Sequence, residues 1–346
     1  MGDEAVIRRA LAAFEREDAT VTPIGVGNIH TTYGASARDG EFILQRVNPI
    51  FAPGIHENIL AVTEHLAAKG LATLRLVPTR GGQSTVDLGG DGIWRLLTRI
   101  PGASYDVCPG AAHARAAGAL VARFHGALVD LAHTFEPLGI VWHHLPTYLE
   151  ELDAALARHL NAALHADVAS LADRLRALIA EWPSVADLPA RVVHTDLKFN
   201  NLLFDPEAGD PPMATSLIDL DTVCRLPLYV ELGDAWRSWC NRSGEDAALA
   251  EFDMGTFVAA AQGYLGDLAF DLTEDEHASL VLALERMSVE LAVRFAADVL
   301  ADSYFGWKPE LFASRAEHNL IRARGQLSLA EQARDVRPQL ASALGL

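Results

Sequence analysis

Residues 192–204 read VVHTDLKFNNLLF, an apolar, strand-like stretch that polar side chains interrupt before it resumes. The interrupting residues are His194, Asp196, Lys198, Asn200 and Asn201. An unpaired charge or amide in an apolar setting costs about 1–3 kcal/mol. The stretch is therefore either a polar turn in solvent or a functional site, and the rest of the chain must decide between them.

The composition predicts a globular protein with an anionic surface. Of the 346 residues 50% are hydrophobic, so the chain is long enough for two domains or one large two-lobed unit. Its 46 acidic residues outnumber its 28 basic residues, which gives a net charge of −18. Such a surface repels nucleic acid and anionic membranes, so a phosphate ligand has to be held locally by a metal, backbone amides or a few placed cations.

Cysteine usage and the lack of targeting segments predict a cytoplasmic protein. Cys108, Cys224 and Cys240 lie far apart without a CxxC pair, as expected in a reducing compartment and without a zinc site. No signal peptide is recognisable, and no apolar run is long enough to span a membrane. The anionic surface has no evident exposed apolar stripe, which favours a monomer, with a homodimer as the alternative.

The chain changes its pattern near residue 100. Short alternating segments such as EFILQRV at 41–47, separated by turn residues, predict an antiparallel sheet, with one helix over 55–69. Beyond 101 apolar residues recur at helical spacing. We therefore expect an α+β, two-lobed fold with a β-rich lobe at 1–100, a helical lobe at 101–346, and a cleft at the join.

The polar residues of the opening stretch have the pattern of a phosphoryl-transfer site. That chemistry uses a loop H-x-D-x-x-x-x-N followed by an aspartate on a strand, and His194, Asp196, Asn201 and Asp219 match it in order. Asp196 then accepts the proton of the attacking hydroxyl, and Lys198 can reach the transferring phosphate. A solvated loop, the alternative, would leave this ordered match between two apolar strands unexplained.

Two further groups of residues suggest a metal and a nucleotide. In SLIDLDTV at 216–223 Asp219 and Asp221 share a face, because strand side chains alternate. With Asn201 they offer hard oxygen donors of the kind that Mg²⁺ selects; Asn201 and Asp219 are the expected ligands, and Asp221 is left open. A Gly-rich turn in the first lobe has backbone amides that can cover nucleotide phosphates, although many such turns only reverse the chain. Its residues are Gly25, Gly27 and Asn28.

With these motifs the sequence resembles the aminoglycoside phosphotransferase and choline kinase superfamily, the small-molecule relatives of protein kinases, over nearly its whole length. The stretches GNIHTTY, EFILQRVNPIFAP, IDLDTV and RAEHNLIRARGQ are similar to the N-acetylhexosamine 1-kinase branch. Those enzymes use ATP to phosphorylate the anomeric hydroxyl of sugars such as N-acetylglucosamine. The resemblance implies a protein-kinase-like fold, ATP and Mg²⁺ as cofactors, and an adenine-contacting hinge at 97–100 that includes Leu97 and Arg99.

The sequence departs from the superfamily pattern at the phosphate-binding cation. Kinases usually carry a lysine on the third strand, where this chain offers Gln45 and Arg46. Either Arg46 substitutes, or the phosphates rely on metal and Lys198. The acidic partner of this cation on the lobe's helix would be Glu57 or Glu64.

The acceptor pocket is expected near the segment 285–307, beside Asp196. A polar stripe at i, i+4 spacing is either a ladder of surface ion pairs or a set of groups facing the acceptor. Its residues are Glu290, Arg294, Asp298 and Asp302. In the functional alternative Arg294 binds sugar hydroxyls, and Tyr304 and Trp307 supply stacking faces; otherwise the two rings are core anchors.

Other residues carry structural expectations. Asp234 is expected to hold the catalytic loop in place. The histidines His125, His143 and His144 have no metal-ligand spacing and are expected to be ordinary core or surface residues.

The sequence thus predicts an ATP- and Mg²⁺-dependent kinase of a sugar hydroxyl, most specifically the anomeric hydroxyl of an N-acetylhexosamine. Two alternatives stay open. One is the same chemistry on an aminoglycoside, choline, homoserine or another sugar. The other is a nucleotide-binding pseudokinase scaffold, suggested by the missing strand lysine.

Replacing Asp196 and Asp219 separates the two catalytic assignments. Asp196→Asn is expected to lower turnover by about 10²–10⁴-fold while ATP still binds, because the residue acts on the acceptor proton. Asp219→Ala is expected to weaken Mg·ATP binding as well as turnover, because it removes a metal ligand. Nucleotide titrations and steady-state rates check both, and wild-type Mg·ATP affinity in Asp219→Ala would contradict the metal assignment.

Overall fold

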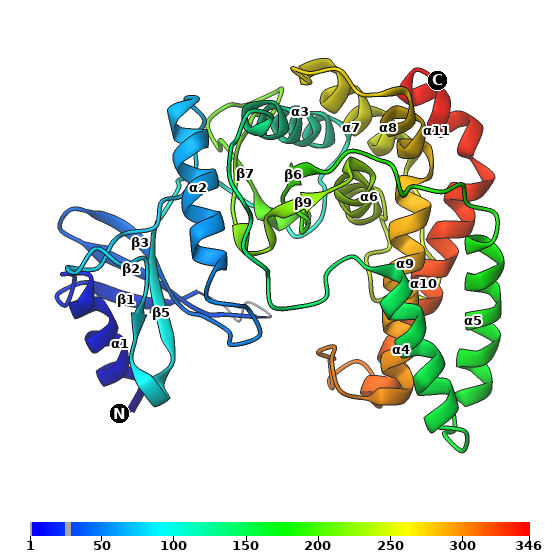
Figure 1. The fold of residues 1–346 in the computed structure, drawn as a ribbon, viewed down its shortest axis with the longest axis horizontal. Helices are drawn as coiled ribbons and strands as arrows, with labels where there is room; N and C mark the ends of the chain where they lie inside the picture. Colours follow the sequence, from blue (N-terminus) through cyan, green and yellow to red (C-terminus); the bar gives the residue numbers. More distant parts are fainter. Residues whose placement is uncertain (1, 25–28) are drawn as a thin grey trace. The chain divides into compact units, whose positions relative to one another are not determined.

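The computed structural model describes residues 2–24 and 29–346, and these form two compact units (Figure 1). The N-terminal unit comprises residues 1–102, 130–140 and 216–223. The C-terminal unit comprises residues 103–129, 141–215 and 224–346. Nothing in the sequence suggested that the two later segments belong to the N-terminal unit.

The N-terminal unit is built on an antiparallel sheet in the order β1-β2-β3-β5-β4. Its strands are β1 (Thr20–Pro23), β2 (Thr31–Ala37), β3 (Gly40–Arg46), β4 (Val86–Asp87) and β5 (Ile93–Thr98). Alternation along β3 and β5 sends Leu44 and Leu96 into a core that also contains Leu11 and Phe14, from α1 (Gly2–Ala13) and the residue after it. The opposite parity carries Gln45 and Arg95, so the sheet has one apolar face and one with buried polar groups.

Besides α1, the N-terminal unit has a helix after the third strand, α2 (Ile55–Ala68), which ends before Gly70, as predicted. Gly70 has a φ of +81°, a conformation that glycine adopts without strain. The β-rich lobe is therefore confirmed, but its single helix is wrong, because α1 also packs on the sheet.

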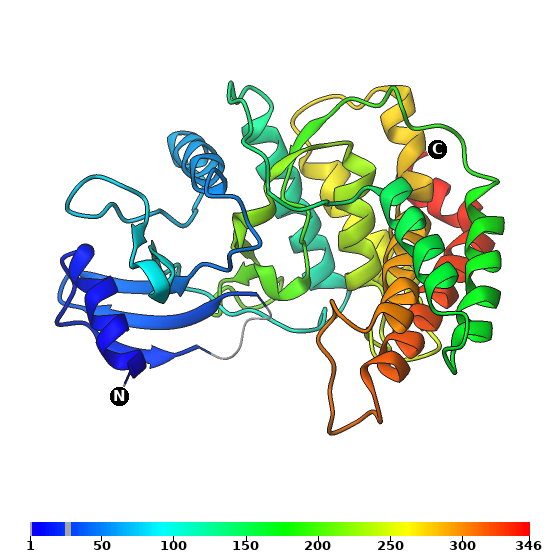
Figure 2. The same ribbon diagram turned by 60° about the horizontal axis from the view of Figure 1, so that its bottom comes forward.

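The C-terminal unit is mostly helical. Its helices are α3 (Ala111–Leu128), α4 (Leu145–Arg158), α5 (His165–Ile179), α6 (Leu228–Trp239), α7 (Met254–Asp267), α8 (Glu274–Ser279), α9 (Ala283–Ala301), α10 (Arg315–Asp335) and α11 (Arg337–Leu344). Figures 1 and 2 show α4, α5, α9 and α10 running side by side. The buried helix α9 packs against the other three through an apolar core that includes Val293, Phe295 and Ala296. The predicted helical lobe is confirmed.

Short strands also interrupt the helices. The predicted strand over 216–223 is wrong beyond Leu217, because Asp219 has a left-handed backbone and residues 220–222 form a 3-10 turn. The strands β6 (Arg191–Val193) and β9 (Cys224–Leu226) pair antiparallel, and β7 (Leu202–Phe204) pairs with β8 (Ala214–Leu217). The polar stretch 194–201 connects β6 to β7. None of the helices among the described residues has the length and apolar character needed to cross a bilayer.

Helices α3 and α7 approach each other closely enough for glycine to be required on both. A Cβ atom on Gly118 would lie 2.2 Å from the Ala260 carbonyl oxygen, and one on Gly263 would lie 2.0 Å from the Arg115 carbonyl oxygen. Backbone of one helix therefore packs directly on backbone of the other, and α3 is fixed against α7.

Gly263→Ala is expected to lower the free energy of unfolding by about 1–3 kcal/mol, because the added methyl group forces the helices apart. Gly266→Ala is the matched control on the same helix, since a Cβ there meets nothing within 4 Å. Alanine favours a helix over glycine by up to about 1 kcal/mol, so the control should be neutral or stabilising. Urea denaturation measures both, and a Gly263→Ala protein as stable as the wild type would contradict the packing.

Candidate active site

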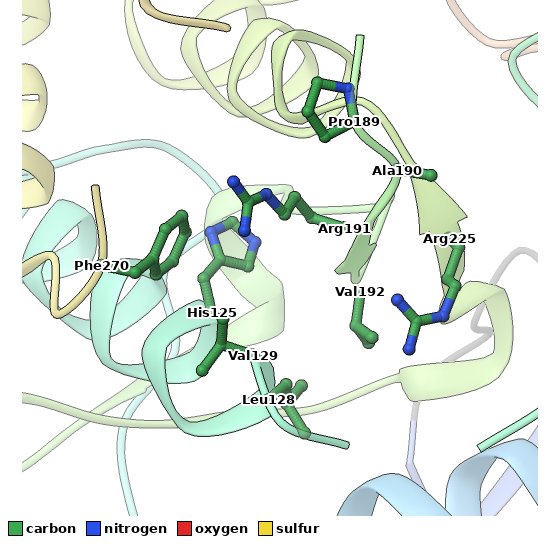
Figure 3. Close-up of a pocket in the computed structure, with 9 residues that line it drawn as sticks. All are labelled: His125, Leu128, Val129, Pro189, Ala190, Arg191, Val192, Arg225 and Phe270. Carbon is green, nitrogen blue, oxygen red and sulfur yellow. The ribbon is translucent and has the colours of Figure 1, made fainter. Parts of the chain in front are cut away.

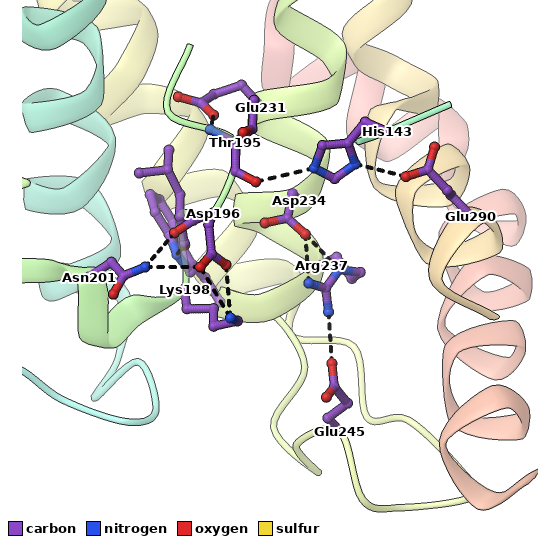
Figure 4. A network of polar contacts seen from close by, with 12 residues as sticks. His143, Thr195, Asp196, Lys198, Asn201, Glu231, Asp234, Arg237, Glu245 and Glu290 are labelled. Carbon is purple, nitrogen blue, oxygen red and sulfur yellow. Dashed lines mark hydrogen bonds and ion pairs between the residues drawn. The ribbon is translucent and has the colours of Figure 1, made fainter. Parts of the chain in front are cut away.

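The loop between β6 and β7 brings together Asp196, Lys198 and Asn201 (Figure 4). The Lys198 Nζ atom lies 2.9 and 3.2 Å from the two carboxylate oxygens of Asp196. Asn201 donates from Nδ2 to the Asp196 carbonyl oxygen at 2.7 Å and to its carboxylate at 3.3 Å. The Asp196 side chain is 16% exposed, so it reaches solvent while these partners hold it.

Lys198 is held as a cation. Burial lowers the pKa of its ammonium group, but the adjacent Asp196 carboxylate outweighs that effect and the pKa is raised. A half-exposed, charged lysine beside Asp196 can face an incoming anionic group.

The loop is strained at Thr195, directly before Asp196. Thr195 has a φ of +66°, a region that a β-branched residue adopts only at a cost of about 1–3 kcal/mol. Its N–H donates to Glu231 Oε2 at 2.5 Å, and its carbonyl oxygen accepts from His143 Nε2 at 3.1 Å. Its hydroxyl accepts from Trp142 Nε1 at 2.8 Å. Three contacts on one residue hold the backbone in this conformation.

Glu231 of α6 is the buried anchor of the loop. Besides Thr195 it accepts the backbone N–H of His194 at 2.9 Å and lies 3.2 Å from His125 Nε2. Its side chain is fully buried, which raises the pKa of the carboxyl, but the two histidines and the backbone N–H groups outweigh burial and the pKa is lowered. Glu231 is therefore an ionised carboxylate that serves the loop backbone. No pattern in the sequence indicated this role beyond the acid's place near the start of a helix.

Asp234 lies one turn further along α6, and its role in holding the catalytic loop stays a prediction. It accepts two hydrogen bonds from Arg237, at 2.6 and 3.1 Å, and Arg237 also lies 3.3 Å from Glu245. Burial raises the pKa of Asp234, but Arg237, His143 and Lys198 together lower it. Asp234 and Arg237 are thus a buried ion pair close enough to the catalytic loop to interact electrostatically with Lys198.

In the N-terminal unit the buried cation is Arg95 of β5, a residue that the sequence analysis did not single out. Arg95 donates to both carboxylate oxygens of Asp221, at 2.5 and 2.8 Å, and to Gln45 Oε1 at 2.9 and 2.7 Å. The predicted substitute Arg46 is exposed at the end of β3, beside Gly92 at a cavity of about 300 Å³. Arg95 is 2% exposed, so desolvation lowers its pKa, but the Asp221 carboxylate reverses that effect.

The predicted acidic partners on α2 do not pair with Arg95. Glu57 and Glu64 are exposed, and the acid that pairs with the buried cation is Asp221. Asp221 also bonds His30, whose Nδ1 accepts the Asn48 backbone N–H at 3.0 Å, so the proton on Nε2 points to the carboxylate.

These contacts decide the role of Asp221 but leave Asp219 as a metal-ligand candidate. Both Asp221 oxygens are engaged by Arg95 and His30, so Asp221 positions the segment rather than offering a ligand. Asp219 has a φ of +64° and lies within 4.8 Å of His30 and Asp221 through one ligand atom each. The Asn201 amide bonds through nitrogen, which turns its oxygen away from Asp196. Carboxylate and amide oxygens fit Mg²⁺, and the pairing of Asn201 with Asp219 on one ion stays a prediction.

The other residues predicted to bind the nucleotide differ in their burial and contacts. Gly25, Gly27 and Asn28 lie outside the described residues. Leu97 is buried on β5 opposite Ile43. Arg99 is exposed, and its guanidinium lies 3.8 Å from Glu41, a surface pair of little weight.

The polar stripe on α9 is not a ladder of surface ion pairs. Glu290 is buried and its Oε1 lies 2.7 Å from His143 Nδ1. Asp298 is buried and accepts backbone N–H groups at 2.9 Å from each of the residues 303–305. Asp302 ends the helix in a left-handed conformation. Glu290 and Asp298 therefore turn inward, and Asp298 fixes the loop that follows α9. Asp302, by contrast, is exposed and lies 3.7 Å from Arg315.

Arg294 is enclosed by aromatic rings. Its guanidinium carbon lies 5.0–5.7 Å from the ring centres of Trp142, Tyr148, Tyr304 and Phe305. Trp307 is half-buried on the same loop and has no ring contact with this group among the described residues. We call Arg294 with its four rings the aromatic cage. It joins two of the predicted acceptor residues, Arg294 and Tyr304, and it touches the catalytic loop through Trp142.

A separate cavity of about 210 Å³ lies in the C-terminal unit (Figure 3). Arg191, Arg225 and Phe270 are among its lining residues, and Arg191 stacks over Phe270 at 4.6 Å and bonds Glu276. The cavity is linked to the catalytic loop through His125, which lines it and lies 3.2 Å from Glu231. It contains none of the residues predicted to act on substrate.

The geometry agrees with comparisons to known proteins. A family model for the phosphotransferase enzyme family matches residues 20–287, which is most of the chain. The chain belongs to the phosphotransferase enzyme family. Membership confirms the superfamily resemblance and makes the protein a phosphotransferase that acts on a hydroxyl group of a small molecule.

Solved structures show the same fold. A microcompartment-associated aminopropanol kinase is 16% identical over 96% of this chain and 98% of that one, with a TM-score of 0.64. An amicoumacin kinase solved with AMP-PNP, Ca²⁺ and Ami is 14% identical over 95% and 93%, with a TM-score of 0.62. A choline/ethanolamine kinase family protein from Mesorhizobium loti is 15% identical over 99% and 98%, with a TM-score of 0.57. At such identities the likeness concerns the kinase-like fold and not the acceptor.

Glu231→Gln is expected to destabilise the protein by about 3 kcal/mol at neutral pH, because an amide cannot accept both loop N–H groups as a carboxylate does. The folded-state pKa of Glu231 lies below the ordinary value of 4.5, so its contribution is full above that pH and is lost as pH falls through the folded pKa. The difference in unfolding free energy between wild type and variant should therefore shrink below about pH 4.5. Denaturant titrations from pH 7 to pH 3 measure it, with exposed Glu150→Gln as control. A difference that stays constant over this range would contradict the assignment.

Proposed function

We propose that this protein is an ATP- and Mg²⁺-dependent kinase of the anomeric hydroxyl of an N-acetylhexosamine. The observation that carries the acceptor class is the aromatic cage around Arg294. Among the described residues Arg294 has no ion pair, and the nearest acid on its own helix face, Glu290, is engaged by His143. As a residue that lines the acceptor site, Arg294 repels cationic acceptors and suits a neutral ligand with carbonyl and hydroxyl oxygens.

The rings of the cage add a second preference. Tyr304 is 62% exposed, although its ring lies beside the Arg294 guanidinium, so an aromatic face and a cation are presented together. Aromatic faces stack on the apolar side of a pyranose or on an acetamido methyl group. A neutral acetamido sugar satisfies both features, whereas choline or an aminoglycoside would place positive charge against Arg294.

The catalytic loop supplies the acid–base chemistry. Asp196 accepts a hydrogen bond from the acceptor hydroxyl, orients it, and takes its proton as the oxygen attacks the γ-phosphorus. The bond from the γ-phosphorus to the β–γ bridging oxygen breaks, and ADP leaves. Lys198 stays protonated beside Asp196 and offsets negative charge on the transferring group. Asn201 and Asp219 would hold Mg²⁺, which when bound neutralises phosphate oxygens of ATP.

The catalytic loop weakens the case for a pseudokinase scaffold. That alternative rested on the missing strand lysine, and Arg95, the buried cation of β5, is already engaged by Gln45 and Asp221. The contacts of Asp196 with Lys198 and Asn201 instead favour a catalytic role.

An ADP-release assay with Mg·ATP tests the proposal on N-acetylglucosamine, N-acetylgalactosamine, glucose, kanamycin, choline and homoserine. We expect turnover on an acetamido sugar, loss of turnover in Asp196→Asn, and no turnover of the 1-O-methyl glycoside, which lacks the reacting hydroxyl. Arg294→Met should raise KM for the sugar at least about tenfold and leave KM for ATP unchanged, because a lost charge-assisted hydrogen bond is worth about 1.5–3 kcal/mol.

The matched control is Arg324→Met, which removes an exposed arginine that pairs with Asp167 on the surface. It should leave both KM values unchanged. Turnover confined to a cationic acceptor, or a sugar KM that is indifferent to Arg294→Met, would overturn the acceptor assignment.

A further inference from the structure

The segment before α4 touches both the catalytic loop and the aromatic cage. Trp142 donates to the Thr195 hydroxyl and its ring forms part of the cage. The next residue, His143, has a φ of +50° and a side chain that is only 5% exposed. A left-handed backbone at a buried histidine is uncommon and places the ring between α9 and the loop (Figure 4).

The partners of His143 determine its protonation. The Thr195 carbonyl oxygen can only accept, so His143 Nε2 carries a proton. The Glu290 carboxylate also accepts, so Nδ1 carries a second proton and the ring is an imidazolium. Burial lowers the pKa of His143, but Glu290 from α9 and Asp234 from α6 outweigh it and the pKa is raised. Geometry and electrostatics therefore agree on a cation.

Thr195 is thus held between opposite charges. Its N–H points to the Glu231 carboxylate and its carbonyl oxygen points to the His143 imidazolium. Each charge meets the end of the residue that has the complementary partial charge, so both favour the left-handed conformation over its relaxed alternatives. Because Thr195 directly precedes Asp196, the fixed backbone conformation of Thr195 sets the position of the Asp196 Cα and Cβ atoms.

We propose that His143, held as a cation by Glu290, is a positioning residue that fixes Asp196 through Thr195 and connects the catalytic loop to the aromatic cage. Glu290 lies one helical turn before Arg294, and Trp142 contacts both Arg294 and Thr195. The same two neighbouring residues, Trp142 and His143, therefore border the cage on one side and the loop on the other. The inference rests on the proposed role of Asp196 as the base.

Three variants test the inference in steady-state kinetics with Mg·ATP and the acceptor that the wild type turns over best. His143→Leu removes both ring donors and is expected to lower kcat at least about 30-fold with both KM values within about threefold, because Asp196 is misplaced while the binding groups remain. His143→Gln keeps one N–H donor for Thr195 and should recover part of that loss. Glu290→Gln keeps the shape of the pair but removes its charge, and its kcat should fall between wild type and His143→Leu.

The control is His159→Gln, an exposed histidine at the end of α4, which should leave kcat unchanged. If His143→Leu fails to fold, as thermal unfolding will show, Glu290→Gln and Trp142→Phe carry the test through the same kcat readout. Wild-type kcat in the folded variants, or a loss that falls only on the acceptor KM, would overturn the inference.

Asp196→Asn, measured in parallel, separates this inference from the proposed function. If Asp196→Asn is inactive and His143→Leu is fully active, the positioning role of His143 is wrong and the role of Asp196 as the base is kept. An active Asp196→Asn would remove the base assignment and with it the premise of both.

Discussion

The buried carboxylate of Glu231 is the interaction on which the catalytic part of the molecule depends. It accepts the consecutive backbone N–H groups of His194 and Thr195 and so holds a β-branched residue at positive φ. Without an acceptor for both groups the strained turn would relax, and the side chains that follow it would diverge. Glu231 therefore supports the contacts among Asp196, Lys198 and Asn201, although its own hydrogen bonds go to the backbone of His194 and Thr195.

The N-terminal unit also uses buried charge. Asp221 is engaged by Arg95 and His30, and two residues before it Asp219 has a left-handed backbone. A buried ion pair adds little to stability once its desolvation is counted, but it strongly disfavours any arrangement that separates the partners. Buried charge fixes a backbone conformation in the C-terminal unit and a set of side-chain partners in the N-terminal unit.

Local pattern predicted the elements and the loop, because both are encoded in neighbouring residues. Strand alternation and helical spacing gave the two kinds of lobe, and HTDLKFNN gave the convergence of Asp196 with Asn201. Arg95 was missed because its task depends on which face of β5 is buried and on an acid more than a hundred residues later. His143 was missed for a similar reason: its partners come from α9 and the catalytic loop, and nothing in its own surroundings along the chain marks it.

The proposed role of Asp196 requires that the loop before it is held rigidly by its backbone contacts. Amide hydrogen exchange at His194 and Thr195, followed by NMR in the ligand-free protein at neutral pH, measures this most directly. We predict protection comparable to that of the buried helix α9, because both N–H groups donate to a fully buried carboxylate. Exchange at the rate of an exposed loop would show that Glu231 does not hold the turn, and would contradict the proposed role of Asp196.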